Sequence, residues 1–133
     1  MNLKDLNEDN TPWLSFENQF VHCKVIQVYD GDSITVILPF ESLSSYYKVK
    51  CRLYGIYTPE IRTRDLEEKT LGFSARDYLR EQVLDKIVWI KCGKWDKYGR
   101  LLITIYQELG SEISLNEQLV ELGYAEEYFG GKR

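Results

Sequence analysis

Three short strings of the sequence carry side chains that could cut a phosphodiester bond. Asp30-Gly31-Asp32 and Thr58-Pro59-Glu60 supply carboxylates, and Lys97-Tyr98-Gly99-Arg100 supplies a guanidinium. Arg52 adds a second guanidinium a little upstream of Thr58. Calcium prefers carboxylate and carbonyl oxygens as ligands, and an arginine fork binds two phosphate oxygens at once. The residue types therefore indicate metal-assisted hydrolysis of a phosphodiester.

The carboxylates of these strings could have two roles, as cation ligands and as a general base. Asp32 lies just past a tight turn and could bind a cation, with Asp30 supporting it from behind. Because Pro59 holds the residue before it extended, Thr58 could aim its carbonyl, and Glu60 its carboxylate, at a fixed point. Glu60 could then position or deprotonate a water molecule. Taken singly, each string is more typical of an ordinary solvated turn.

Arg52 and Arg100 could hold a phosphate between them. Two guanidinium forks beside a pentavalent phosphorus would stabilise the charge that grows in the transition state. Tyr98 could stack on a base or donate a hydrogen bond to a phosphate. The ordinary alternative for both arginines is a solvated position on a strand. His22 is the only histidine and lies far from these strings in sequence, so we interpret it as structural.

Composition narrows the class of protein. A chain of 133 residues with 44% apolar and 29% charged residues is expected to form one globular domain with a real core. The net charge of -4 argues against a protein that coats nucleic acid by bulk electrostatics, but it permits an enzyme with a local cationic site. The N-terminus has no apolar run typical of a secretory signal, and no window is apolar enough to span a membrane.

The three cysteines are an odd number, widely spaced and without a CxxC pair. Each lies in a strand-like run, so we expect buried free thiols rather than a disulfide or a zinc site. Free thiols of this kind are typical of a reducing compartment. We therefore expect an intracellular protein, cytoplasmic or nuclear.

Alternation of apolar and polar residues predicts five short strands. They cover residues 20–28, 33–38, 47–56, 87–92 and 99–106. A change of phase at Ile26 predicts a bulge in the first strand, and residues 39–45 are expected to form a loop. In the third strand, Lys48, Lys50 and Arg52 are expected to face away from the core.

Two capping signals predict helices. Asp65 is expected to cap a helix and Glu68 to close a capping box, with an apolar face that includes Leu71, Ala75, Tyr78, Leu79 and Val83. Gly72 inside this helix predicts close packing against a strand. Ser114 with Glu117 opens a second, short helix with Leu115, Leu119 and Leu122 on one stripe, and Gly123 is its expected end.

The order of elements predicts the fold class. Three strands, a helix, two strands and a short helix match an α+β protein built on an OB-fold five-stranded barrel. We assign residues 18–133 to this domain. Residues 1–17 are interpreted as a partly disordered N-terminal extension, with Trp13 or Phe16 docking on the domain.

In their order and spacing, these strings resemble the staphylococcal nuclease (thermonuclease-like) family. The similarity runs from about residue 20 to residue 123 and is carried by four segments: residues 30–33, 52–60, 96–100 and 115–117. The resemblance implies an OB-fold barrel and calcium-dependent cleavage of DNA and RNA that leaves 3′-phosphate ends. The implied partners are DNA and RNA, single-stranded or frayed, bound by a monomer that needs no membrane.

The resemblance also implies roles for individual residues. Asp32 looks like a calcium ligand, Thr58 like a ligand through its carbonyl, and Asp30 like an acid behind them. Glu60 looks like the carboxylate that activates or orients water, and Arg52 and Arg100 look like the catalytic phosphate clamps. Lys97 and Tyr98 look like contacts to the terminal phosphate of the nucleotide.

The sequence departs from the family pattern at two places. The family has an aspartate ligand before Thr-Pro-Glu, where this chain has Tyr57, and a neutral phenol is a poor calcium ligand. Bacterial members also have a further C-terminal helix, and the tyrosines near it that stack on the nucleotide have no clear counterpart here. Tyr124, Tyr128 or Phe129 could substitute for them.

These departures leave three hypotheses. The leading one is a metal-dependent endonuclease whose calcium affinity is weakened by Tyr57. The second is a catalytically impaired OB-fold module that binds nucleic acid or protein, since fold alone does not determine activity. The third is a scaffold domain whose N-terminal extension carries the function.

Overall fold

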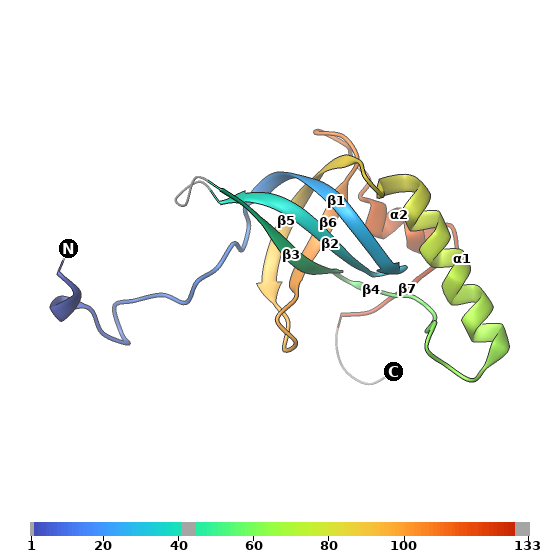
Figure 1. The fold of residues 1–133 in the computed structure, drawn as a ribbon, viewed down its shortest axis with the longest axis horizontal. Helices are drawn as coiled ribbons and strands as arrows, with labels where there is room; N and C mark the ends of the chain where they lie inside the picture. The colour runs from blue at the N-terminus through green and yellow to red at the C-terminus, as the bar shows by residue number, and fades with distance from the viewer. Residues whose placement is uncertain (1, 41–44, 130–133) are drawn as a thin grey trace.

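A closed five-stranded barrel flanked by two helices forms the body of the computed structural model, which describes residues 2–40 and 45–129 (Figure 1). The barrel strands are β1 (Phe20–Asp30), β2 (Ser33–Phe40), β3 (Ser45–Leu53), β5 (Ile87–Trp95) and β6 (Leu101–Tyr106). They close in the order β1-β2-β3-β6-β5, with β3 and β6 parallel and the other neighbours antiparallel. This architecture confirms the predicted α+β OB-fold barrel.

Shorter elements complete the chain. The helices are α1 (Leu66–Val83) and α2 (Leu115–Glu121), and a 3-10 turn, η1 (Leu3–Asp5), lies in the N-terminal extension. A separate two-stranded sheet pairs β4 (Ile56–Tyr57) with β7 (Glu126–Glu127). In the part of the chain that the structure describes, no helix is long and apolar enough to cross a membrane.

The barrel interior is filled by alternate side chains of the strands. On β6, Leu101, Ile103 and Ile105 are fully buried, while the residues between them are half-buried. Each such side chain stabilises the fold by about 1.5–3 kcal/mol through burial. The interior also holds the three cysteines, which are buried and free as predicted. Burial raises the pKa of the Cys23 thiol to about 12 and that of Cys92 to about 11, so these thiols stay protonated and unreactive.

The strands follow the predicted pattern, but several bounds differ: β1 and β5 extend to Asp30 and Trp95, and β6 begins at Leu101. A register shift between Val25 and Gln27 confirms the bulge at Ile26. The predicted loop at residues 39–45 is wrong at its edges, because Pro39 and Phe40 continue the pairing of β2 with β3. The residues between them and Ser45, numbered 41–44, lie outside the described residues.

The third predicted strand is wrong beyond Leu53. Gly55 has φ +79°, in the left-handed region that favours glycine, so the chain turns there instead of continuing the strand. A Cβ on Gly55 would lie 2.8 Å from the Phe129 ring, which packs over the turn. The turn sends the chain out of the barrel into β4, and from there to Thr58 and Glu60.

Helix α1 begins at the predicted cap, Asp65. The Glu68 carboxylate, however, accepts a hydrogen bond from a different group than predicted. The Asp65 carboxylate accepts the N–H groups of Glu67 and Glu68 at 3.0 and 3.2 Å. Glu68 does not close a capping box; its carboxylate accepts the Glu60 N–H at 3.4 Å. The helix thereby binds the segment that carries Glu60.

The buried face of α1 is narrower than predicted. Ala75, Leu79 and Val83 are buried, but Leu71 is 54% exposed. The predicted packing of Gly72 against a strand is wrong. A Cβ there would lie 2.7 Å from the Pro59 carbonyl oxygen, so Gly72 packs on the backbone of the loop after β4.

Helix α2 and the N-terminal extension follow the prediction in part. Ser114 Oγ accepts the Glu117 N–H at 3.1 Å, and Gly123 ends the helix with φ +83°. Leu122 is 54% exposed, so its assignment to the buried stripe is wrong. In the extension, Phe16 packs on the rings of Phe40 and Trp95, whereas Trp13 is 94% exposed.

Candidate active site

A cleft of about 710 Å³ gathers residues from all three strings of the sequence. Its lining comes from the β1–β2 turn, the end of β3, β4 and the β5–β6 turn. Of the catalytic, metal-binding and phosphate-binding residues singled out in the sequence, together with Tyr57, eight line it: Asp30, Asp32, Arg52, Tyr57, Glu60, Lys97, Tyr98 and Arg100. Thr58 lies behind them, 3% exposed and bonded to Asp32.

Asp32 is the buried carboxylate of the cleft, at 7% exposure. Its Oδ2 accepts the backbone N–H of Thr58 at 3.2 Å and lies 3.6 Å from an Arg52 nitrogen. Its Oδ1 accepts the Ser33 hydroxyl at 3.2 Å. These contacts join three separate parts of the chain at one side chain.

Gly31 makes this junction possible. A Cβ at Gly31 would lie 2.6 Å from Thr58 Cγ2 and 2.8 Å from Ala75 Cβ, distances that no real Cβ tolerates. The β1–β2 turn therefore packs directly on the Thr58 segment and on α1. In this turn, glycine is required by close packing.

Asp30 adds a second acidic group beside Asp32. Its carboxylate accepts the Asp32 N–H at 3.1 Å. Partial burial, and next the neighbouring Asp32 charge, raise the pKa of Asp30 to about 6. Two carboxylates placed this close create a local negative potential that a cation relieves.

The donors in the cleft fit a hard cation that has few protein ligands. They are the Asp32 carboxylate, with Asp30 next to it; Thr58, whose N–H bonds to Asp32, lies behind them. Within residues 2–40 and 45–129, no group of three or more acidic, histidine or cysteine side chains is arranged to hold a metal ion. Calcium takes six to eight oxygens, so most of its ligands here would be water.

Tyr57 lies against Glu60. The Tyr57 hydroxyl donates a hydrogen bond of 2.6 Å to Glu60 Oε1, and its ring contacts the Tyr128 ring with a centroid distance of 6.0 Å. At the position where the family pattern has a metal ligand, this chain therefore has a hydrogen-bond donor to the candidate base. No sequence pattern indicated this bond, which joins two residues three positions apart across Thr58-Pro59.

The two arginines are held by different anchors. Arg52 lies near Asp32, donates to the Leu53 carbonyl at 3.4 Å and has its guanidinium 5.9 Å from the Tyr128 ring centroid. Arg100 Nε donates to Asp96 Oδ2 at 2.7 Å, and its Nη1 donates to Ser33 Oγ at 3.4 Å. Both guanidiniums are thus oriented by partners within the protein.

Asp96 is the anchor that the sequence reasoning missed. Burial acts to raise its pKa, but the N–H groups of Arg100 and Tyr98 and the Arg100 guanidinium outweigh burial and lower it. The available signal was the short spacing from Asp96 to Arg100 across a Tyr-Gly turn, where an aspartate side chain commonly accepts backbone N–H groups.

The remaining residues predicted to contact the nucleotide lie in different places. Tyr98 is 72% exposed, with Lys97 Nζ at 5.2 Å and Arg100 at 5.5 Å from its ring centroid. Tyr128 and Phe129 also line the cleft. Tyr124 stacks on Tyr78 of α1 at 4.6 Å and is not among the residues that line the cleft.

The chain is similar to known proteins. The family model described as staphylococcal nuclease homologue matches residues 50–133. The chain is 32% identical over 126 residues to an uncharacterised protein of Methanocaldococcus jannaschii. It is 30% identical over 105 residues to an uncharacterised endonuclease of Escherichia coli O157:H7, and 36% identical over 114 residues to the endonuclease YhcR of Bacillus subtilis.

These matches cover only part of each relative. Each takes in 79% of this chain, but 58% of the Methanocaldococcus jannaschii protein, 60% of the Escherichia coli protein and 9% of YhcR. The chain therefore spans less than two thirds of the length of these curated relatives.

Proposed function

The chain belongs to the family of staphylococcal nuclease homologues, and on that premise we propose that it is a calcium-dependent endonuclease. Its substrates in this proposal are single-stranded or frayed DNA and RNA, and its products carry 3′-phosphate ends. The observation that carries the proposal is the cleft in which Arg52 and Arg100 lie together with Glu60 and Asp32. A pure binding module has little use for two anchored arginines beside a carboxylate that can accept a proton.

Asp32 and the Thr58 carbonyl would hold the metal, with Asp30 supporting them. When bound, calcium supplies positive charge to the scissile phosphate and to the water that attacks it. The chain itself supplies the rest of the chemistry.

In the proposed reaction, the water oxygen forms a bond to phosphorus while the bond from phosphorus to the 5′ oxygen breaks. Glu60 orients the water and accepts its proton. The leaving 5′ oxygen takes a proton from solvent. Arg52 and Arg100 stabilise the added charge on the phosphate oxygens, and their ion pairs with Asp32 and Asp96 hold them in place beforehand.

In this mechanism, Tyr57 weakens the binding of calcium. A carboxylate at this position would add a unit of negative charge to the site, and a phenol adds none at neutral pH. We therefore expect half-maximal activity at a higher calcium concentration than a site with two aspartates requires.

A calcium titration of nuclease activity tests the proposal. Wild-type protein should cleave single-stranded DNA with a midpoint near ~1 mM calcium, the weak end of the range of protein calcium sites. Glu60→Gln should abolish cleavage, while exposed Glu67→Gln, an equal change on α1, should leave it intact. Absence of cleavage at every calcium concentration would overturn the enzyme proposal.

A second candidate function is a module that binds nucleic acid without cutting it. The hydrogen bond between Tyr57 and Glu60 favours it, because this bond occupies the carboxylate that would otherwise receive a proton. The net charge of -4 also suits a chain with only local cationic sites. Metal-independent binding of an oligonucleotide, unchanged in Glu60→Gln, would select this function over the nuclease.

A further inference from the structure

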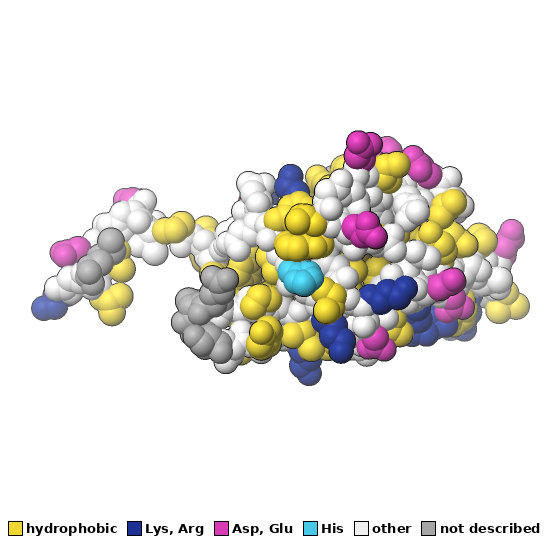
Figure 2. Space-filling model, turned by 90° about the horizontal axis from the view of Figure 1, so that it is seen from above, with side chains coloured by type: hydrophobic (Ala, Val, Ile, Leu, Met, Phe, Trp, Pro, Cys, Tyr) yellow, Lys and Arg dark blue, Asp and Glu magenta, His cyan; other side chains and the backbone are white. Residues whose placement is uncertain are grey.

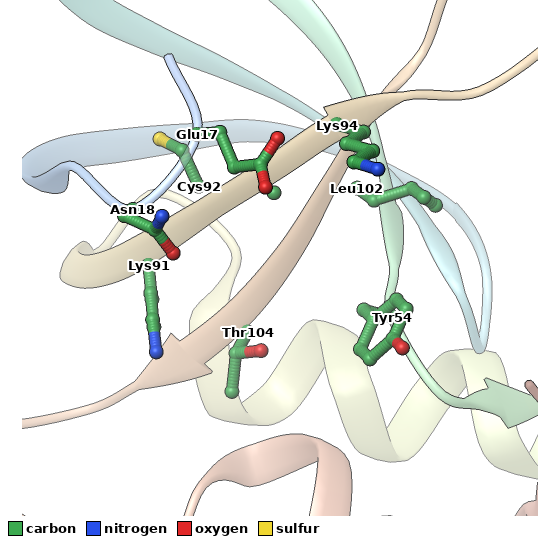
Figure 3. Close-up of a pocket in the computed structure, with 9 residues that line it drawn as sticks. Glu17, Asn18, Tyr54, Lys91, Cys92, Lys94, Leu102 and Thr104 are labelled. Atoms are coloured by element: carbon green, nitrogen blue, oxygen red, sulfur yellow. The ribbon is translucent and has the colours of Figure 1, made fainter.

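A second hollow lies on the outside of the barrel, apart from the catalytic cleft. This outer groove, of about 390 Å³, runs over β5 and β6 and includes Lys91, Lys94, Leu102 and Thr104 (Figure 3). Glu17 of the N-terminal extension borders it. None of the three chemical strings in the sequence contributes to it, so the proposed hydrolysis leaves it unexplained.

The outer groove is continuous with the cleft. Tyr54 and Leu102 line both hollows, and Leu102 on β6 is paired with Arg52 on β3. A polymer that crosses Tyr54 and Leu102 therefore passes from the catalytic arginines into the outer groove along the protein surface.

The far end of the groove leads to an aromatic cluster, made of Phe20, His22, Trp89 and Tyr106. Phe20 lies 5.5 Å from Tyr106 and 6.2 Å from Trp89, and His22 stacks on Trp89 at 4.7 Å. Phe20 is paired with Lys91, and Trp89 with both His22 and Tyr106, so the cluster lies next to the groove on the same outer face. Figure 2 shows the single histidine among hydrophobic side chains on this surface.

The distance suits a few nucleotides. Leu102 and Tyr106 are both outward residues of β6, which places them ~13 Å apart along the strand. A strand in the cleft would therefore need only a short flanking segment to reach the aromatic rings.

The charges favour a polyanion over a basic peptide. Lys91 and Lys94 lie along β5, against one acidic neighbour, Glu17. A neighbouring hollow, which shares Tyr54 and Thr104 with the groove, is lined by Glu117, Glu121 and Glu127. A chain of phosphates would follow the lysine side and avoid the acidic side.

From these observations we propose that the outer groove and the aromatic cluster form an accessory site for single-stranded nucleic acid. The site holds nucleotides that flank the strand bound in the cleft: the lysines contact phosphates, and Phe20 with its neighbouring rings stacks on unpaired bases. This inference rests on the proposed function. It predicts that strand length controls affinity, which the catalytic cleft alone does not explain.

Fluorescence anisotropy on the full chain carrying Glu60→Gln tests the site without cleavage. The probes are labelled oligothymidylates of about 4 and about 12 nucleotides with calcium present, and the longer probe should bind roughly tenfold more tightly. Lys91→Glu and Phe20→Ala should each remove most of that gain and leave the short probe unaffected. Lys4→Glu, the same charge change in exposed η1, should keep the gain.

Tryptophan fluorescence provides a second measurement that needs no mutation in the cluster. Replacing Trp13 and Trp95 by phenylalanine leaves Trp89 as the single tryptophan of the three. Its emission should be quenched by the long probe and not by the short one, since only the long probe reaches the cluster.

The outcomes separate the two proposals. Equal affinity for both probes, or losses in Lys91→Glu and Phe20→Ala no greater than in Lys4→Glu, would overturn the accessory site. An equal gain with a blunt duplex of the same length would overturn the stacking of unpaired bases. If wild-type protein cleaves nothing but the length dependence persists, the nuclease proposal fails and the accessory site stands.

Discussion

The two sides of the cleft are built differently. On the arginine side, Arg100 is held by a 2.7 Å ion pair to Asp96 and by Ser33. On the carboxylate side, Asp32 is the one buried acid within the described residues of the cleft, and the exposed Glu60 is held by the Tyr57 hydroxyl. In the proposed nuclease, charge pairs therefore orient the groups for phosphate, while binding of a cation would depend on backbone packing around a single buried carboxylate.

Each side of the cleft is therefore expected to be sensitive to a different kind of mutation. An arginine anchored by a carboxylate keeps its orientation even when neighbouring segments shift. Among the residues that the structure describes, the Thr58–Glu60 segment has no such ion pair; it is placed by hydrogen bonds to Asp32 and Glu68 and by close contacts with Gly31 and Gly72. Mutations should therefore affect the arginine side through charge and the carboxylate side through shape.

The largest expected effect is on the arginine side. Arg100→Ala should lower kcat/KM roughly 10³-fold, because it removes a preorganised donor to the phosphate in the transition state. Arg100→Lys should recover only part of this, since lysine keeps the charge and loses the fork. Steady-state kinetics at saturating calcium measure both, with exposed Arg62→Ala as the control. Retention of a tenth of the activity in Arg100→Ala would contradict the clamp.

The carboxylate side should respond to shape at Gly72. A Cβ there would lie 2.7 Å from the Pro59 carbonyl oxygen and 3.0 Å from that of Glu60, so Gly72→Ala must displace the segment. We expect a loss of about 1–3 kcal/mol in the free energy of unfolding. Activity should fall roughly 10- to 100-fold through misplacement of Glu60.

Ser74→Ala provides the matched control on the same helix. Ser74 is exposed, so its replacement gains helix propensity without a clash. Denaturant unfolding and kinetics should show no loss for Ser74→Ala. Equal behaviour of the two variants would mean that α1 does not position Glu60.

The sequence predicted local features of the fold correctly and missed features that depend on long-range packing. The strand pattern, the bulge at Ile26 and the caps at Asp65 and Ser114 are local features, and local alternation and capping chemistry indicated them. The end of β3 was missed because Gly55 turns under Phe129, which lies far along the chain. Long-range packing of this kind has no signature in a local pattern.

For the site, the sequence predicted which residues lie together but not all of their hydrogen bonds. The order and spacing of the three strings predicted which residues the cleft gathers, because each string is rigid and lies at the end of a strand. The bond from the Glu60 N–H to Glu68 was not predictable, since it requires the tertiary path of the chain after β4. The three-residue spacing from Tyr57 to Glu60 permits their bond but does not by itself indicate it.

A smaller effect is expected from Tyr57→Asp, which tests the metal side directly. The new carboxylate adds charge beside Asp32, so the calcium concentration for half-maximal activity should fall roughly tenfold. Tyr57→Asn is the matched control, since it loses the phenol without adding charge. A calcium titration of cleavage measures this concentration for both variants. An equal shift in Tyr57→Asn and Tyr57→Asp would mean that the effect comes from loss of the ring.

Tyr57→Phe isolates the hydroxyl. It removes the 2.6 Å bond to Glu60 and keeps the ring contact with Tyr128. We expect kcat to fall roughly fivefold, about 1 kcal/mol, because Glu60 loses the donor that orients it. The calcium midpoint should stay unchanged, in contrast to Tyr57→Asp. An increase in kcat would instead mean that the tyrosine restrains Glu60 from accepting a proton.

The smallest expected effect concerns the charge pair that anchors the arginine side. Although burial opposes it, the N–H groups and guanidinium around Asp96 lower its pKa below the ordinary value of 3.8. A lowered pKa in the folded state means that this contribution to stability is present above about pH 4 and is lost as the pH falls through the folded pKa. Asp96→Asn should be less stable than wild type at neutral pH and should lose less stability on acidification. Urea unfolding from about pH 7 to about pH 3 measures the two slopes. Parallel slopes would mean that Asp96 does not hold Arg100 by charge, and the arginine side would then rest on packing as the carboxylate side does.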